Sequence, residues 1–234
     1  MKYLMYVSYD GSKFHGFQRQ KDIKNIQGYL ENSLSNILNE KIVIKGAGRT
    51  DRGVHAYNQG VHFETTKDIN KLKRIFNKGQ KDIKIKKIKQ VADDFHARHS
   101  VKSKTYLYKL DLSNKRNINY YGKERNNLDI SLMRKISRLF MGTHNFKNFV
   151  AGERINYDST ILDIKIYKLN KIVYFKFKGI GFYRYMVRNL VGALVEVGKS
   201  KVDESVIKDM LELKCDKRLP TASPNGLYLY NIKY

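Results

Sequence analysis

Hydrophobic and polar positions follow two rhythms along the chain, which predict strands and helices in mixed order. The opening YLMYVSYDG alternates and ends in a turn, as a strand does, whereas NIQGYLENSLSNILNE repeats its apolar residues at helical spacing. Strands are then predicted in KIVIK, GVHFE and DIKIKKIKQV, and a helix near residues 68–77. Antiparallel-looking strands with helices between them are typical of an α+β unit.

A second unit with a similar rhythm is predicted to begin near Phe95. Its strands lie in KTYLYKLDLS, in GLYLYNIKY and in the pair STILDIKIYKL and KIVYFKFKGI, which turns around Asn170. Its helices lie in DISLMRKISRLFMG, FYRYMVRNLVGALVEVG and DESVIKDMLELK. The sequence therefore predicts two similar α+β lobes, residues 1–94 and 95–234, with a cleft between them.

Composition adds a strong charge to this picture. The 46 Lys and Arg residues against 22 Asp and Glu give a formal charge of +24, which favours a polyanionic partner, although gene base composition is another source of lysine. Charge alone does not separate RNA, DNA and anionic membrane. No apolar run approaches the roughly eighteen residues of a membrane span, and the N-terminus lacks a signal-peptide core, so we expect a cytoplasmic protein. With one cysteine, Cys215, and scattered histidines, no metal site is expected.

The run KGAGRTDRGVH, residues 45–55, contains the sharpest local chemistry. Gly46 and Gly48 begin a nucleotide-binding pattern, but Asp51 occupies the third glycine position and would repel a phosphate. The following VHAYNQGVHFE alternates like a strand, where a nucleotide site needs a helix. Asp51 therefore either caps a structural turn or acts at an electrophilic carbon, such as the anomeric carbon of a sugar.

Aromatic residues interleave with basic ones in KTYLYK, FYRYMVRN and FKNF. Such segments hold unstacked nucleotides, because every nucleotide offers the π face of its base for stacking and a phosphate for a basic side chain. Tyr106 and Tyr108 lie on one face of their predicted strand, following Lys104. The alternative for each tyrosine is a structural role, as a core residue whose hydroxyl reaches solvent.

Several of these segments carry a resemblance to a known family. GAGRTDRGVHA resembles the signature of the TruA family of tRNA pseudouridine synthases. Other segments follow in the family's order across nearly the whole chain: YDGSKFHGFQRQ, IQGYLENSLSNIL, VHFETT, DDFHARHSVKSKTYLY, GFYRYMVRNLVGALVEVG and GLYLYNIKY.

The resemblance implies a cofactor-independent isomerase. Such an enzyme detaches uracil from its ribose carbon, turns the base and rejoins it through carbon. The implied fold has two α+β lobes whose antiparallel sheets join into one extended sheet, with helices packed on it and the active cleft between the lobes. The implied assembly is a homodimer that holds one tRNA, and the implied substrate is the anticodon stem-loop at positions 38 to 40.

The resemblance also implies roles for four residues. Asp51 is the expected catalytic aspartate, attacking the ribose or the base or directing the cleavage. Tyr106 would stack on the flipped uridine, and its hydroxyl could assist proton removal. Arg188 resembles the basic residue that pairs with the aspartate, with a helix-surface arginine as the alternative. Arg49 resembles the arginine that fills the stack after the nucleotide flips.

Three departures from the family pattern bear on the substrate. Phe17 stands where the family usually has Trp, IFNKGQKDI is shorter than usual and lacks its Leu-Pro, and Ser159 stands where an Arg commonly precedes the Thr. The alternatives are a paralogue acting on other tRNA or ribosomal RNA positions, a non-catalytic RNA-binding protein, or a nucleotide-dependent enzyme, which Asp51 disfavours.

Overall fold

The C-terminal strand returns to the N-terminal part of the chain, so the two structural units are not consecutive halves. The computed structural model describes residues 1–234, which form one unit of Met1–Lys102 with Tyr228–Tyr234 and a second unit of Ser103–Leu227. The predicted boundary at Phe95 is corrected to Ser103, and the last strand moves to the first unit. The reason is long-range pairing: Tyr228 is the parallel strand partner of His55, and their rings stack 4.6 Å apart.

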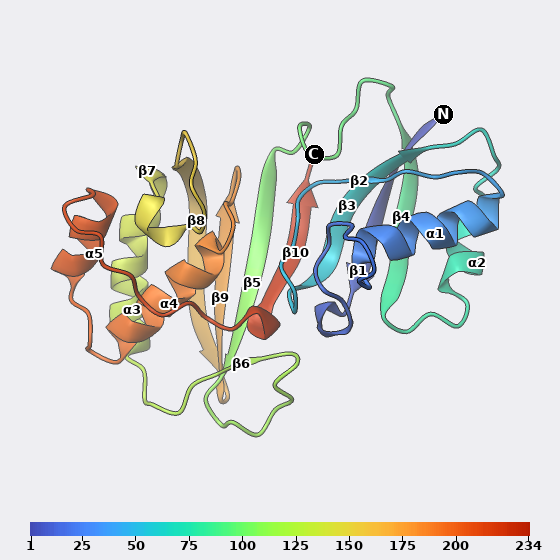
Figure 1. Cartoon of the computed structure of the whole chain (residues 1–234). Coiled ribbons are helices and arrows are strands. Elements are labelled where there is room, and N and C mark those ends of the chain that lie inside the picture. Colours follow the sequence, from blue (N-terminus) through green and yellow to red (C-terminus); the bar gives the residue numbers. More distant parts are fainter. The chain divides into compact units, whose positions relative to one another are not determined.

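The first unit is built on a mostly antiparallel sheet with strand order β4-β1-β3-β10. β1 pairs antiparallel with both β3 and β4, β10 is parallel to β3, and short β2 pairs with β3. Figure 1 shows α1 lying across this sheet. The bounds are β1 Lys2–Tyr9, β2 Lys45–Gly46, β3 His55–Glu64, β4 Ile83–Val91, β10 Leu227–Lys233, α1 Ile26–Leu38 and α2 Leu72–Asn77.

Helix α1 forms where its apolar stripe predicts it. The side chain of Asn25 accepts a hydrogen bond from Gly28 N at 2.8 Å and caps the first turn. Asn39 adopts the left-handed conformation, with φ of 49°, and ends the helix. The stripe of Ile26, Leu30 and Leu34 is fully buried, so α1 is held by its sheet-facing side.

The strand predicted in KIVIK is mostly wrong, because only Lys45–Gly46 pairs as a strand. Ile42 and Ile44 are buried as expected, but their backbone N–H groups bond to side chains of α1. Ile42 N donates to Ser35 Oγ at 2.8 Å, and Ile44 N donates to Glu31 Oε1 at 3.0 Å. These donors are therefore satisfied without a sheet partner.

The second unit has a sheet of order β5-β9-β8-β7, with β6 parallel to the end of β5. β8 and β9 form the predicted hairpin, whose turn places Asn170 at φ of 54°. In Figure 1, α3 and α4 lie against one face of β8 and β9. The bounds are β5 Ser103–Asp111, β6 Gly122–Lys123, β7 Gly142–Asn145, β8 Asp158–Leu169, β9 Ile172–Gly179, α3 Ile130–Ser137, α4 Met186–Gly198 and α5 Glu204–Leu211.

Helix α4 begins later than its periodicity predicts. The apolar pattern starts at Phe182, but the helix starts at Met186 because Tyr185 has φ of 64° and ψ of −7°. A residue with a side chain seldom adopts this left-handed conformation, and it breaks the helical path. With ten strands and five α-helices, the predicted α+β class is confirmed.

Candidate active site

The loop between β2 and β3 is anchored by hydrogen bonds at its middle and its ends. Ala47 N donates to Gly60 O at 2.8 Å, and Gln59 Nε2 donates to Gly48 O at 2.8 Å. The turn itself closes through Val54 N, which donates to Asp51 O at 3.1 Å. Strand β3 follows directly, as predicted, and no helix begins here. The loop therefore lacks the helix N-terminus that a dinucleotide site uses.

A second segment, Tyr9–Phe17, packs against this loop from outside. The hydroxyl oxygens of Tyr9 and Thr50 lie 2.9 Å apart, and Phe17 N donates to Thr50 O at 3.0 Å. Gly11 N donates to Nδ1 of His55 at 3.1 Å. A Cβ on Gly11 would lie 2.0 Å from Val54 O, so only glycine permits this approach.

Phe17, which by the resemblance stands where the family usually has Trp, packs beneath the same loop. It is buried, and its ring fills the space where Gly46 has no side chain. A Cβ on Gly46 would lie 2.6 Å from that ring. This departure from the family pattern therefore lies in the packing beneath the loop and not on the exposed surface.

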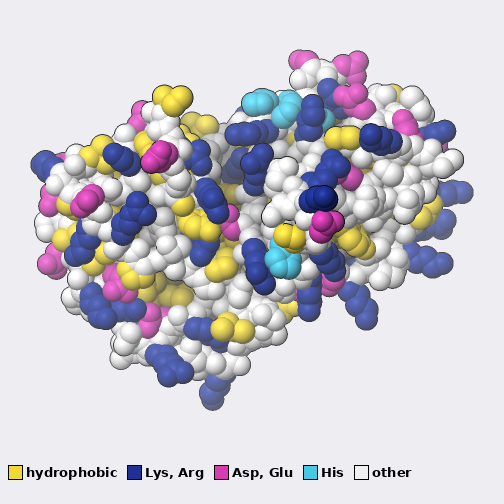
Figure 2. All heavy atoms as spheres, viewed as in Figure 1, with side chains coloured by type: hydrophobic (Ala, Val, Ile, Leu, Met, Phe, Trp, Pro, Cys, Tyr) yellow, Lys and Arg dark blue, Asp and Glu magenta, His cyan; other side chains and the backbone are white.

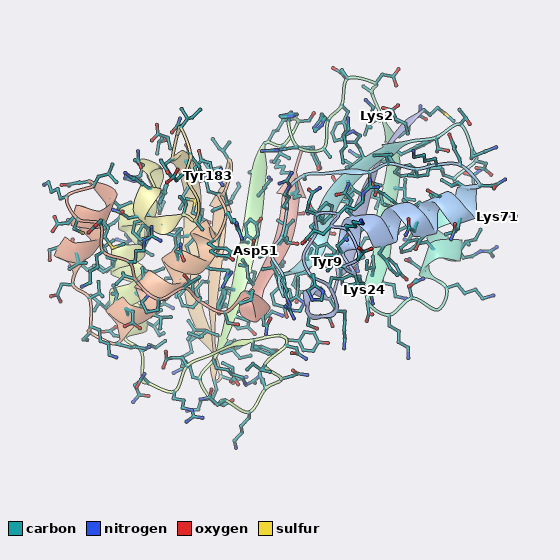
Figure 3. All side chains as sticks on the ribbon, in the orientation of Figure 1. Lys2, Tyr9, Lys24, Asp51, Lys71 and Tyr183 are labelled. Atoms are coloured by element: carbon teal, nitrogen blue, oxygen red, sulfur yellow. The ribbon has the colours of Figure 1, made fainter.

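Arg49 and Asp51 leave the loop on either side of a buried residue. Arg49 is exposed, Thr50 is buried and Asp51 is half-buried. Gly53, with φ of 83°, allows the chain to turn back toward β3. Figure 3 labels Asp51, and also Tyr9 at the end of β1. This arrangement presents one carboxylate and one guanidinium from a loop whose backbone is hydrogen-bonded at Ala47 N, Gly48 O, Thr50 O, Asp51 O and Val54 N.

In the second unit, Tyr106 lies in the middle of β5 and remains half-buried. Its ring meets the edge of the Phe182 ring, with centroids 5.2 Å apart and planes at 80°. Tyr108 lies on the same face but is a core residue, 1% exposed. Burial raises the pKa of Tyr108, although the positive charge of nearby Arg188 acts in the opposite direction. The two tyrosines thus differ, and Tyr106 alone keeps a partly accessible ring.

Arg188 lies in the first turn of α4 and is held along its stem. Its Nε donates to Ala222 O at 2.7 Å, and Ala222 N donates to Arg188 O at 3.1 Å. The guanidinium carbon lies 4.5 Å from the ring centroid of Tyr185, within cation–π range. The segment that carries Ala222 crosses the helix where Gly192 has no side chain, since a Cβ there would lie 1.7 Å from Pro220 O.

The structure therefore brings Arg49 and Asp51 together on one loop of the first unit and places Tyr106 and Arg188 in the second. Tyr9, Phe182 and Tyr185 support these residues and were not singled out from the sequence. Their signal was the glycine spacing in YDGSKFHG and the motif FYRYMVRN.

No group of three or more His, Cys, Asp or Glu side chains is arranged to hold a metal ion. None of the helices has both the length and the apolar character needed to cross a membrane.

Comparison with known proteins shows the family. Residues 5–100 and 136–234 match the sequence model of a family described as tRNA pseudouridine synthase. The whole chain aligns at 39% identity with 95% of tRNA pseudouridine synthase A of Streptococcus agalactiae serotype Ia. It aligns at 37% identity with 99% of the protein of that name from Pseudothermotoga lettingae. The chain belongs to the tRNA pseudouridine synthase family and is an RNA pseudouridine synthase, an isomerase.

A solved structure of a Cbf5-Nop10-Gar1 complex shows only a weak likeness. It aligns over 82% of this chain and 45% of its own chain, at 12% identity and a TM-score of 0.41. This likeness is too low to bear on the site.

Proposed function

We propose that this protein converts uridine to pseudouridine at positions 38 to 40 in the anticodon stem-loop of tRNA, with Asp51 as the catalytic group. One observation carries the assignment of Asp51. Its neighbours in the loop are fixed by hydrogen bonds to Tyr9, Phe17 and Gln59, and Asp51 itself remains half-buried. A carboxylate held on a rigid backbone is suited to act at one atom of a bound substrate.

The chemistry of the reaction requires such a group. The bond between ribose C1′ and uracil N1 breaks, the base turns, and a bond forms between C1′ and C5. The proton that leaves C5 is matched by the proton that N1 gains, so the reaction is redox-neutral. Departure of the base leaves cation-like character at C1′, which a carboxylate stabilises by charge or by forming a bond. Asp51 supplies that carboxylate, acting at the ribose or at the base.

Three further side chains are proposed to act on the same uridine. A base inside a stem-loop has to leave its stack before its glycosidic bond is reached. Arg49, exposed beside Asp51, would fill the vacated position in the stack. Tyr106 would stack on the flipped uracil, and its hydroxyl would assist removal of the C5 proton. Arg188 would pair with Asp51 and keep it ionised.

The surface charge supports an RNA substrate. Lys and Arg side chains are spread over the face of the molecule drawn in Figure 2, and the net charge is +24. Phosphate neutralisation by such residues supplies most of the non-specific affinity for nucleic acid. As the resemblance implies, we also propose a homodimer, which sedimentation equilibrium with and without tRNA tests directly. We further propose a cytoplasmic location, which fractionation of cells tests.

Replacing Asp51 by Asn tests the catalytic assignment. The amide keeps the size and polarity of the side chain but loses the charge. Single-turnover assays on unmodified tRNA should yield no pseudouridine, whereas filter binding should show nearly wild-type affinity, because affinity depends on basic and stacking residues. Asp94→Asn, the same change at an exposed position, is the matched control and should retain full activity. Pseudouridine formed by Asp51→Asn, with deamidation excluded by mass spectrometry, would contradict the assignment.

Mapping pseudouridine in total RNA from cells with and without the gene tests the substrate. Loss of the modification at tRNA positions 38 to 40 is the expected result. Loss at other tRNA or ribosomal RNA positions would instead identify a paralogue, and an unchanged map would contradict the proposed substrate altogether.

A further inference from the structure

Thr50 lies between exposed Arg49 and half-buried Asp51, and its hydroxyl and its carbonyl oxygen both contact residues outside the loop. Its side chain is 6% exposed, and Oγ1 lies 2.9 Å from the hydroxyl of Tyr9, which is itself 4% exposed at the end of β1. Its carbonyl oxygen accepts a hydrogen bond from Phe17 N at 3.0 Å. The residue before Asp51 is therefore fixed at its side chain and at its carbonyl.

These two contacts fix the peptide plane between Thr50 and Asp51. The carbonyl of Thr50 is covered by Gly16, which has φ of 92° and whose Cβ would lie 3.0 Å from that oxygen. On the other side of the peptide, the carbonyl of Asp51 accepts a hydrogen bond from Val54 N. The direction in which the Asp51 side chain leaves the backbone depends on this plane, because the dihedral angles on both sides of it set the position of Cβ.

The hydroxyl pair is not needed to fill space. Phe in place of Tyr9 and Val in place of Thr50 would occupy nearly the same volume without two buried hydroxyls. A buried hydrogen bond restricts the relative orientation of the two side chains, since it forms only over a narrow range of distances and angles. An apolar pair would tolerate small rotations of the loop that the hydrogen bond opposes.

We infer that Tyr9 and Thr50 are positioning residues that aim the carboxylate of Asp51 through the peptide between Thr50 and Asp51. This inference rests on the proposed catalytic role of Asp51. Neither hydroxyl touches the substrate in this account. Loss of either one lets the loop rotate, so the reacting carboxylate is misplaced while the RNA-binding surface is unchanged.

Three single substitutions and one double substitution test this inference in the full-length protein. Tyr9→Phe and Thr50→Val each remove one hydroxyl, Thr50→Ser keeps the hydroxyl and loses only a methyl group, and the double variant removes both hydroxyls. At saturating tRNA, Tyr9→Phe and Thr50→Val should lower the single-turnover rate about 10- to 100-fold, the range expected for a misplaced catalytic group. The filter-binding Kd should not change, and Thr50→Ser should recover most of the rate.

The double variant separates positioning from general loss of stability. If the two hydroxyls act only through each other, the double variant should be no slower than the slower single variant. Tyr234→Phe is the matched control in the same unit, because it removes another part-buried tyrosine hydrogen bond, 3.0 Å from Tyr234 Oη to Ala97 O. It should lower the melting temperature without lowering the rate.

Wild-type rates in folded Tyr9→Phe and Thr50→Val would overturn the inference. Equal slowing by Tyr234→Phe would also overturn it, because stability alone would then explain the effect. If Thr50→Val does not fold, Tyr9→Phe decides the result. An active Asp51→Asn variant would instead show that the proposed function has failed. An inactive Asp51→Asn variant beside fully active Tyr9→Phe and Thr50→Val variants would show that only the positioning account has failed.

Discussion

Replacing Asp111 by Asn should destabilise the second unit more than any surface substitution. Asp111 ends β5, and its side chain is 0% exposed. Its carboxylate accepts hydrogen bonds from Ser113 Oγ at 2.6 Å, Lys123 Nζ at 2.9 Å and Arg116 Nη1 at 3.1 Å. Burial alone would raise the pKa of Asp111, but the hydrogen bonds from the side chains of Ser113 and Lys123 and from the backbone N–H of Arg116 outweigh burial and hold the pKa well below its usual range.

The expected loss of unfolding free energy depends on how exposed the charged partners of Asp111 are. Breaking a fully buried ion pair from one side costs about 3–5 kcal/mol. The side chains of Arg116 and Lys123 are 34% and 21% exposed. Water can therefore solvate their charges in part when the carboxylate of Asp111 is removed. We therefore expect Asp111→Asn to lower the free energy of unfolding by about 2–3 kcal/mol. For a protein of this size the melting temperature should fall by roughly 5–10 °C.

Urea and thermal denaturation at pH 7 measure this effect, and acid should reduce it. Because the folded pKa of Asp111 is lowered, its stabilisation is complete above the unfolded pKa, about 3.9, and is lost as the pH falls toward the folded pKa. The difference between wild type and variant should therefore shrink below about pH 4. Asp163→Asn, which loses an exposed pair with Lys165 at 3.8 Å, should change the free energy of unfolding by less than about 1 kcal/mol. Equal stability of Asp111→Asn and wild type at pH 7 would refute the reasoning.

Three further predictions concern RNA binding and turnover. Tyr106→Phe keeps the ring and should lower the single-turnover rate far more than affinity, whereas Tyr106→Leu should slow turnover further because it also loses stacking worth about 1–3 kcal/mol per base; equal rates would contradict the stacking role. Arg188→Lys cannot reproduce the planar donor that bonds Ala222 O, and a rate loss of about 10- to 100-fold is expected; wild-type turnover would place Arg188 outside the site. Affinity for tRNA should fall about 10³-fold between 50 and 200 mM salt if six or more phosphates are contacted; a flat filter-binding titration would exclude this.

Local patterns were sufficient to predict the elements whose ends are marked by turn or cap residues. The hairpin around Asn170 and helix α1 after Asn25 are examples, because each combines a clear period with a residue suited to the end. Short β6 and β7 were missed, since two to four residues are too few to display a period. Element prediction therefore succeeded where the information is local.

The boundary between the units depends on contacts distant in sequence. Tyr228 pairs with His55, and Tyr234 Oη donates to Ala97 O at 3.0 Å, so the C-terminal strand contacts residues more than a hundred positions earlier in the chain. No alternation within GLYLYNIKY indicates which strand it will pair with. The segment was therefore recognised as a strand but assigned to the wrong unit.

The candidate site shows the same division between local chemistry and distant support. The loop around Asp51 was recognised because glycines on both sides of Arg49, Thr50 and Asp51 allow a turn that presents these side chains, although a structural turn has the same local pattern. The hydroxyl of Tyr9 reaches Thr50 across 41 positions of sequence, and only the folded chain brings the two together. The spacing of Gly11 and Gly16 was a visible signal, because both glycines allow close approach to the loop.

The contrast between Tyr106 and Tyr108 shows why a period of two is insufficient to identify a substrate-stacking residue. The two side chains lie on one face of β5, so the alternation of the sequence does not distinguish between them. The two tyrosines differ in what covers them. The Tyr108 hydroxyl reaches Gly122, where a Cβ would lie 2.2 Å from it, and Gly226 packs against the Tyr108 ring. Those glycines come from segments 14 and 118 positions further along the chain. A tyrosine becomes a candidate for base stacking only where no such segment covers it, and on this face that position is Tyr106 beside Phe182.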